Sequence, residues 1–106
     1  MLRIYPVILE MVRDVRRMLP AIERQDSDLA RQLRRAVASV PLNVSEGMYS
    51  RGKNRTARYH SAMGSAREVL SCFEVAEAMG YIEPVGDAFV DRQNRIIGTL
   101  VRLVRP

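Results

Sequence analysis

Histidine and cysteine are nearly absent from this sequence, which contains one of each, His60 and Cys72. A single cysteine excludes an intrachain disulfide, and a zinc site needs more than one histidine and one cysteine. The two residues lie on one predicted helix, about three turns apart, which is too far for a nucleophile and its base. We therefore expect Cys72 to be a packed residue and His60 a surface or interface residue.

Several other catalytic and targeting patterns are also missing. The sequence has no Glu-x-x-His pair, the usual ligand set of a di-iron site in a helical bundle, and no glycine-rich phosphate loop. It has no apolar run long enough for a membrane-spanning helix, and its first residues lack the long apolar region of a signal peptide. We therefore expect a cytoplasmic protein that is not an enzyme and that holds no cofactor or metal.

Apolar residues at helical spacing dominate what is present. Nearly half of the 106 residues are apolar, which argues against disorder, and no stretch alternates with the period of a strand. Apolar residues recur every three or four positions in four segments. The predicted helices span about Tyr5–Glu23, Asp28–Met48, Lys53–Met79, and from between Pro84 and Asp87 to Arg105. With short connections, this pattern predicts one all-α domain over residues 1–106, an antiparallel up-and-down four-helix bundle.

Local signals mark the ends of these helices. Asp26 or Ser27 is expected to cap the start of the second helix. Gly47 and Gly80 are expected to end the second and third helices, where a left-handed residue satisfies the last carbonyls. Pro20 lies in the last turn of the first helix, where it is expected to bend the helix or end it early.

Pro41 lies in the middle of the second predicted helix. Its ring crowds the carbonyl of Val37 and it offers no N–H, which costs roughly 3 kcal/mol in a helix interior. The apolar spacing nevertheless continues in phase through Val40 and Val44, so we predict one helix kinked at Pro41. The alternative is two helices broken at Val40, because the residue before a proline avoids the helical region.

Basic residues outnumber acidic ones by five, and sixteen of the seventeen are arginines. The segment from Leu29 to Arg67 carries eight basic residues and one acidic, whereas the rest carries nine basic and eleven acidic. Arginine forms bidentate bonds to phosphate, so we predict that this segment binds nucleic-acid backbone without strong sequence preference. The predicted contact residues are Arg31, Arg34, Arg35, Arg51, Lys53, Arg55 and Arg58. The alternative is a solvated basic face.

Two tyrosines flank the basic segment. Tyr49 and Tyr59 are candidates to stack on bases, with packing in the core as the alternative for Tyr59.

Four further polar residues fall on the second and third predicted helices, namely Asn43, Glu46, Arg67 and Glu68. Because buried polar groups need partners, we predict a structural polar network in the bundle. In it Glu46 pairs with Arg35 or Arg67, and Asn43 bonds the carbonyl that the proline frees. The alternative is a polar functional site inside the bundle.

The apolar stripes of the first and fourth predicted helices are wider than a bundle seam needs. Exposed apolar patches mark association sites, so the width predicts a homo-oligomer. The candidate interface residues are Val7, Val12, Leu19, Val101 and Val104. The alternative is that these residues cover the edges of the core.

Three motifs, in this order and at this spacing, resemble a known family. They lie at Gln32–Ala36 continuing through Ser39–Gly47, at Gly64–Glu68, and at Gly80–Ile82. They resemble the signature of four-helix-bundle proteins encoded in intervening sequences of bacterial 23S ribosomal RNA genes. The accessory variability protein of diversity-generating retroelements is a distant relative of that family, and the resemblance covers nearly the whole chain.

The resemblance implies a non-catalytic accessory protein that binds nucleic acid and acts as a ring-shaped homo-oligomer of five subunits. The partners that the resemblance implies are other copies of the chain, RNA or DNA, and a reverse transcriptase or another protein. No association with a membrane is expected. Apart from the resemblance, the only feature of the sequence that indicates nucleic-acid binding is the basic segment. The alternative function is a protein-interaction or scaffold module that does not bind nucleic acid directly.

Overall fold

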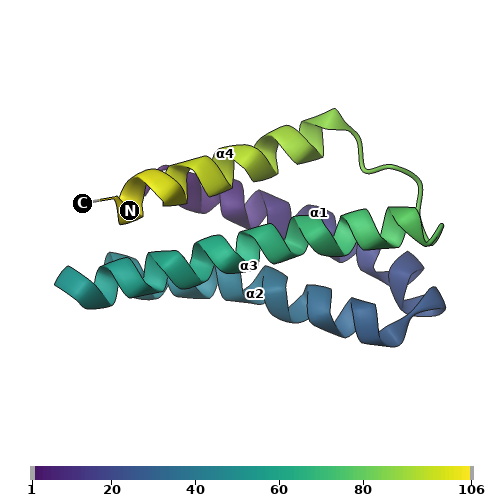
Figure 1. Cartoon of the computed structure of the whole chain (residues 1–106), viewed down its shortest axis with the longest axis horizontal. Coiled ribbons are helices and arrows are strands. Elements are labelled where there is room, and N and C mark those ends of the chain that lie inside the picture. Colours follow the sequence, from purple (N-terminus) through teal and green to yellow (C-terminus); the bar gives the residue numbers. More distant parts are fainter. Residues whose placement is uncertain (1, 106) are drawn as a thin grey trace.

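The fold consists of four α-helices joined by short connections (Figure 1). The computed structural model describes residues 2–105, and its helices are α1 Ile4–Gln25, α2 Ser27–Met48, α3 Gly52–Ala78 and α4 Asp87–Val104. Helices make up 86% of this part of the chain, which contains no strand, whereas roughly one-third is typical of globular proteins. The predicted all-α fold with four helices is confirmed.

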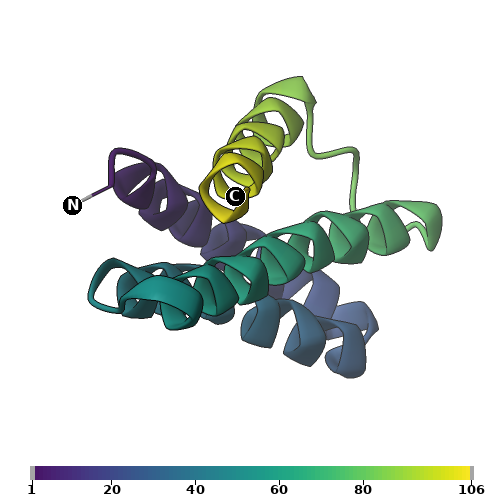
Figure 2. The same cartoon turned by 60° about the vertical axis from the view of Figure 1, so that its left-hand side comes forward.

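The helices form an antiparallel up-and-down bundle (Figures 1 and 2). Each helix packs against its neighbours in the chain, most extensively α2 against α3, and α4 closes the bundle less tightly against α1. The bundle measures 42 × 25 × 20 Å. This topology brings the start of α1, the α2–α3 connection and the end of α4 to one end of the molecule. The other two connections lie at the opposite end.

All four helices contribute apolar side chains to one core. Successive buried residues of α1 are three, four or seven positions apart, which keeps them on one face of the helix; they are Ile4, Ile8, Met11, Val15 and Ile22. The rings of Phe73 and Phe89 meet edge to face, with centroids 5.0 Å apart, and join α3 to α4.

Two polar side chains of α4 also face inward. Gln93 is fully buried, and its amide nitrogen donates to the carbonyl of Ala66 on α3 at 2.9 Å. The mostly buried side chain of Arg92 pairs with Asp14 of α1 at 2.5 Å. These two contacts tie α4 to both of its neighbours, and sequence reasoning did not predict them.

Both helices that contain an internal proline continue through it. Helix α2 is unbroken across the buried Pro41, so the prediction of one helix is correct and the two-helix alternative is wrong. The kink at Pro41 stays a prediction. Helix α1 likewise continues past Pro20 to Gln25 and does not end early there.

The predicted caps at Asp26 and Gly80 are confirmed. The Oδ1 atom of Asp26 accepts from the backbone N–H of Leu29 at 3.0 Å, and its Oδ2 accepts from the hydroxyl of Tyr81 at 3.2 Å. Gly80 has a φ of 76°, and the N–H of Tyr81 bonds the carbonyl of Ala76 at 2.8 Å. This is the Schellman arrangement. Asp26 therefore joins the start of α2 to the chain that follows α3.

The predicted role of Gly47 is wrong. Gly47 lies inside α2, its φ is not positive, and the helix ends one residue later at Met48. A Cβ at this position would lie 2.4 Å from Cε1 of Tyr59, whose buried ring packs against the glycine. The glycine is needed for the close approach of α3, not for backbone freedom. Core packing of Tyr59, the alternative to base stacking, is confirmed.

The wide apolar stripes mostly serve the core. Four of the five candidate interface residues pack against it, namely Val7, Val12, Leu19 and Val104, and Val101 is partly buried. These four cover the core edges, so stripe width no longer argues for association. The large apolar side chains that the chain does expose are different ones: Leu42, Tyr49, Val75 and Met79.

Replacing Gly47 by alanine should destabilise the fold, because the new methyl group overlaps the buried ring of Tyr59. Overpacking of this kind costs about 1–3 kcal/mol, which outweighs the better helix propensity of alanine. Gly64→Ala is the matched control, since Gly64 is helical, exposed and has open space around its Cβ position. Thermal melting should show a lower Tm for Gly47→Ala and an equal or higher Tm for Gly64→Ala. Equal Tm values for the two variants would contradict this packing.

Replacing Asp26 by alanine should lower the free energy of unfolding by about 1–2 kcal/mol, since it removes an N-cap together with the bond from Tyr81. Asp26→Asn is the matched control, because asparagine caps helices about as well as aspartate. Urea denaturation measures both variants. A stability of Asp26→Ala equal to that of the parent would exclude the role of Asp26 in joining the two connections.

Candidate nucleic-acid interface

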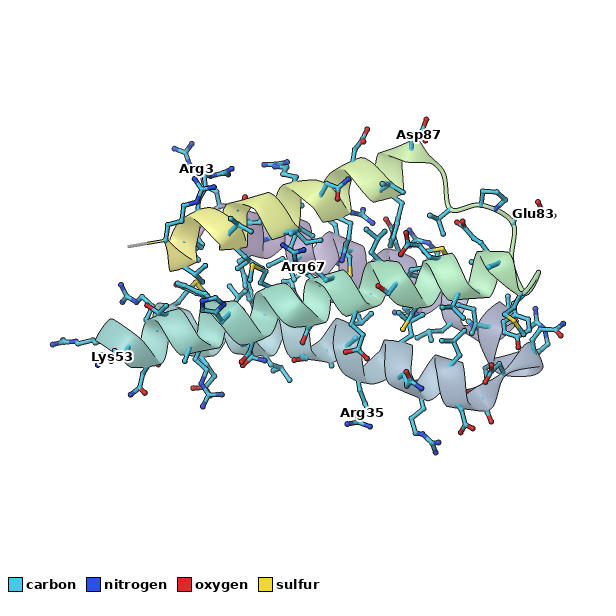
Figure 3. All side chains as sticks on the ribbon, in the orientation of Figure 1. Arg3, Arg35, Lys53, Arg67, Glu83 and Asp87 are labelled. Carbon is cyan, nitrogen blue, oxygen red and sulfur yellow. The ribbon has the colours of Figure 1, made fainter. Side chains whose placement is uncertain are left out.

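The predicted basic residues form two separate groups along the bundle, and Figure 3 labels one residue of each, Lys53 and Arg35. The first group, on the α2–α3 connection and the first turns of α3, is Arg51, Lys53, Arg55 and Arg58. The second, on the first half of α2, is Arg31, Arg34 and Arg35. All seven are exposed, but the helical stretch from Arg35 to the end of α2 is about 20 Å long. The basic segment of the sequence is therefore two surfaces.

The chain termini add basic residues to the first group. Arg3 precedes α1, Arg102 lies in the last turn of α4 and Arg105 follows α4, and all three are exposed. The up-and-down topology brings them to the same end as the α2–α3 connection, where Figure 3 shows Arg3 and Lys53. We call this set the basic end; it comprises Arg3, Arg51, Lys53, Arg55, Arg58, Arg102 and Arg105.

The opposite end of the bundle is acidic. Its two connections and the adjoining helix ends carry Asp26, Asp28, Glu77, Glu83 and Asp87, against Arg24 in the last turn of α1. Figure 3 labels Glu83 and Asp87. The molecule is thus polarised along its long axis, and such a field attracts a polyanion toward the basic end and away from the other. Sequence reasoning missed this polarity because it counted charges by segment and did not combine them with the predicted topology.

The second basic group is partly neutralised. Arg31 pairs with Asp28 one turn away, and Arg34 pairs with Glu23 on α1. Such exposed pairs contribute about 0–1 kcal/mol to stability, but each places a carboxylate beside the guanidinium. Arg35 differs, since it lines a groove between α2 and α3.

Arg55 has a structural role at the basic end. Its Nε donates to the carbonyls of Gly47 and Ser50, at 3.2 and 2.9 Å. These acceptors lie in the last turn of α2 and just beyond it, where helix carbonyls lack intrahelical partners. Arg55 therefore fixes the α2–α3 connection and is less free to contact phosphate than Arg51, Lys53 or Arg58.

Tyr49 remains the stacking candidate beside the basic end. It is the most exposed of the large apolar side chains, at 87%. With Arg55 it lines a cavity of about 280 Å³, so its ring is available for contact with a base.

The polar network differs from the prediction. Asn43 donates to the carbonyl and hydroxyl of Ser39, both at 2.9 Å, instead of the carbonyl of Val37 that Pro41 frees. Glu46, Arg67 and Glu68 are exposed and take part in no ion pair within residues 2–105. The expected pairing of Glu46 with Arg35 or Arg67 is therefore not formed. These charges lie on the surface, where water solvates them without a partner.

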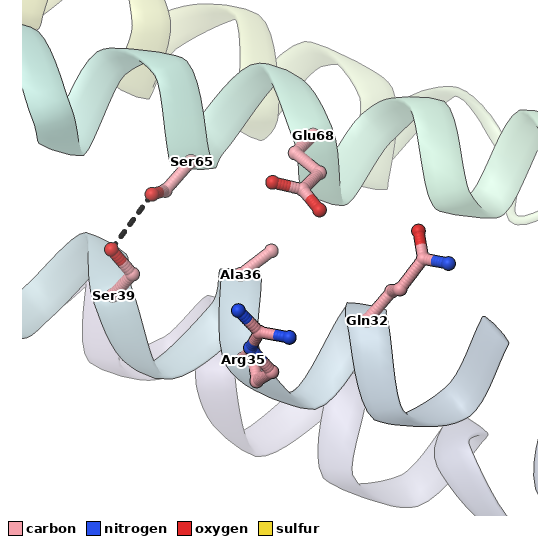
Figure 4. Close-up of a pocket in the computed structure, with 6 residues that line it drawn as sticks. All are labelled: Gln32, Arg35, Ala36, Ser39, Ser65 and Glu68. Carbon is pink, nitrogen blue, oxygen red and sulfur yellow. Dashed lines mark hydrogen bonds between the residues drawn. The ribbon is translucent and has the colours of Figure 1, made fainter. Parts of the chain in front are cut away.

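A polar groove lies between α2 and α3 (Figure 4). Its volume is about 550 Å³, and its lining consists of Gln32, Arg35, Ala36, Ser39, Ser65 and Glu68. Ser65 of α3 donates to Ser39 of α2 at 2.7 Å and joins the two walls. Both serines belong to the motifs Ser39–Gly47 and Gly64–Glu68 of the sequence, but their hydrogen bond was not predicted, because it depends on how the two helices align.

His60 and Cys72 are placed as expected, with His60 exposed and Cys72 buried. Burial, and then the neighbouring charge of Glu68, raise the pKa of the Cys72 thiol, which keeps it protonated and unreactive. No group of three histidine, cysteine, aspartate or glutamate side chains in the described chain could hold a metal ion.

These features define a small helical bundle with one basic end and a polar groove. Residues 2–101 match the family model of the 23S rRNA-intervening sequence protein. Because the match spans nearly the whole chain, the protein belongs to this family. No curated protein and no solved structure matches it. Within residues 2–105, no helix has both the length and the apolar character required to cross a membrane.

Replacing Arg55 by alanine should lower the free energy of unfolding by about 1 kcal/mol, because a charged donor to two carbonyls is lost. Arg51→Ala, four residues earlier, removes the same charge without removing a hydrogen bond to α2 and should change stability by less than about 0.5 kcal/mol. Urea denaturation distinguishes them. Equal effects of the two substitutions would contradict the capping role of Arg55.

Proposed function

We propose that the protein is a non-catalytic accessory protein that binds the phosphate backbone of nucleic acid through its basic end. The observation that supports this most strongly is the convergence of seven basic side chains from three separate parts of the chain, with acidic side chains at the opposite end. A charge separation of this kind orients a polyanion on the molecule as well as attracting it.

The chemistry of the basic end suits backbone contacts. Six of its seven residues are arginines, whose planar guanidinium groups match phosphate geometry. Contacts to phosphate carry no sequence information directly, while the exposed ring of Tyr49 can stack on any base. The name of the family refers to an intervening sequence of 23S ribosomal RNA, so RNA is the first ligand to test. The proposed place of action is the cytoplasm of a bacterium.

The proposal includes a ring-shaped homo-oligomer of five copies. Val75 and Met79 lie one helical turn apart at the end of α3 and are 47% and 61% exposed, so this apolar pair is the candidate subunit contact. In a ring the basic end recurs on every subunit. Several such ends on one strand raise avidity without any new type of contact.

Reversing three charges at the basic end should weaken binding strongly. The variant is Arg51→Glu, Lys53→Glu and Arg58→Glu, which leaves Arg55 and its bonds to α2 intact. Because each neutralised phosphate releases counterions, the parent should bind single-stranded RNA strongly at low salt and progressively more weakly as salt rises. Fluorescence anisotropy should show at least a tenfold loss of affinity for the variant, an order-of-magnitude expectation from the lost phosphate contacts.

The matched control is Arg13→Glu, Arg16→Glu and Arg95→Glu, three exposed arginines on the outer faces of α1 and α4. It changes the net charge equally, so it separates a local site from a general charge effect. If both variants bind like the parent, or lose affinity equally, the basic end is not the binding surface. If the parent shows no salt-dependent binding, a protein-interaction module becomes the better explanation.

The solution mass should be five times the 12.1 kDa mass of one chain. Light scattering coupled to gel filtration measures it at micromolar concentration. Replacing Val75 and Met79 by glutamate should reduce the mass if these exposed side chains form the subunit contact, because charged residues disfavour an apolar interface. A monomer mass for the parent would refute the ring.

A further inference from the structure

We propose that the polar groove between α2 and α3 is a binding site for a guanine base of single-stranded nucleic acid. The inference rests on the proposed function, because the backbone of the same strand would be held by arginines outside the groove. It adds a base preference to binding that is otherwise insensitive to sequence.

The groove brings together residues from two distant stretches of the chain. Gln32, Arg35, Ala36 and Ser39 come from α2, whereas Ser65 and Glu68 come from α3. Figure 4 shows the side chains of Gln32 and Glu68 reaching toward one another across the gap. The bond between Ser39 and Ser65 fixes the alignment of the two helices at one end of the groove. A rigid frame thus supports three longer polar side chains.

The longer side chains are not needed for the fold. Gln32, Arg35 and Glu68 are exposed, and Arg35 and Glu68 line the same groove without forming an ion pair. A guanidinium and a carboxylate that face one space unpaired can each bind a ligand. The guanidinium offers donors only, and the ionised carboxylate offers acceptors only.

The carboxylate determines which ligand fits. Glu68 repels phosphate, so the groove is not a continuation of the backbone-binding surface. It requires a ligand that presents hydrogen-bond donors to Glu68 and acceptors to Arg35. A nucleobase offers both kinds of group in one plane, and the volume of about 550 Å³ accommodates a nucleoside.

Guanine matches this pair of side chains best among the four bases. Its O6 and N7 accept a bidentate arginine, and the adjacent N1–H and N2 amino group donate to a carboxylate. Cytosine has a single donor group beside its acceptors. In adenine and uracil, hydrogen-bond donors and acceptors alternate along the edge of the base. Neither Arg35 nor Glu68 can therefore form two hydrogen bonds with adjacent groups of these bases.

The test compares short single-stranded RNAs at low salt, all-uridine except for one central position. That position is uridine, guanine, hypoxanthine or 7-deazaguanine; hypoxanthine lacks the N2 amino group and 7-deazaguanine lacks N7. We expect guanine to raise affinity about fivefold over uridine, the lower limit for a good bidentate contact, and each analogue to lose most of the gain. Fluorescence anisotropy measures all four.

Two conservative variants assign the preference to the groove. Glu68→Gln removes the second acceptor, and Arg35→Lys keeps the positive charge but not the bidentate geometry. Each should abolish the preference for guanine, measured as the ratio of affinities for the guanine and the all-uridine RNA in the same variant. Glu74→Gln and Arg31→Lys, exposed positions on the same helices outside the groove, are the matched controls and should retain the preference.

The possible failures are distinguishable. Salt-dependent binding with equal affinity for all four RNAs overturns the guanine site and leaves the proposed function intact. A guanine preference that survives in both groove variants places the site elsewhere and also overturns the inference. Absence of binding to every RNA overturns the guanine site and the proposed function together.

Discussion

The close packing of α2 on α3 is the contact on which the rest of the structure depends. At one end Gly47 admits the ring of Tyr59, and in the middle Ser65 bonds Ser39. Small residues at these points let the two helices run side by side over most of their length. The groove lies along the contact between α2 and α3. Arg55 of α3 holds the short connection that carries Arg51.

The charge polarity of the molecule follows from topology more than from composition. Four antiparallel helices bring both chain termini and the α2–α3 connection to one end, and in this sequence all three are basic. The other two connections are acidic, partly because carboxylates such as Asp26 and Glu77 bond backbone N–H groups there. The basic end therefore lies far from most of the carboxylates.

The apolar period of the sequence was sufficient to predict the four helices, and local chemistry to predict the caps at Asp26 and Gly80. Properties that depend on two distant segments could not be predicted in the same way. A glycine near a helix end reads as a backbone signal, yet Gly47 is required by a ring twelve residues away. Arg55 looked like part of a charge run, but its bonds to α2 depend on the path of the connection. The wide stripes of α1 and α4 were also ambiguous, because the same residues can cover a core edge or form an interface.

The most direct test of this polarised bundle is a residue-by-residue map of where nucleic acid binds. Amide chemical shifts of the labelled protein, followed during titration with single-stranded RNA, provide that map on the intact chain. We expect the largest changes at the basic end, around Arg51, Lys53 and Arg58, and none around Glu83 and Asp87. Changes concentrated at the acidic end, or spread evenly over the molecule, would contradict a nucleic-acid-binding role for the basic end.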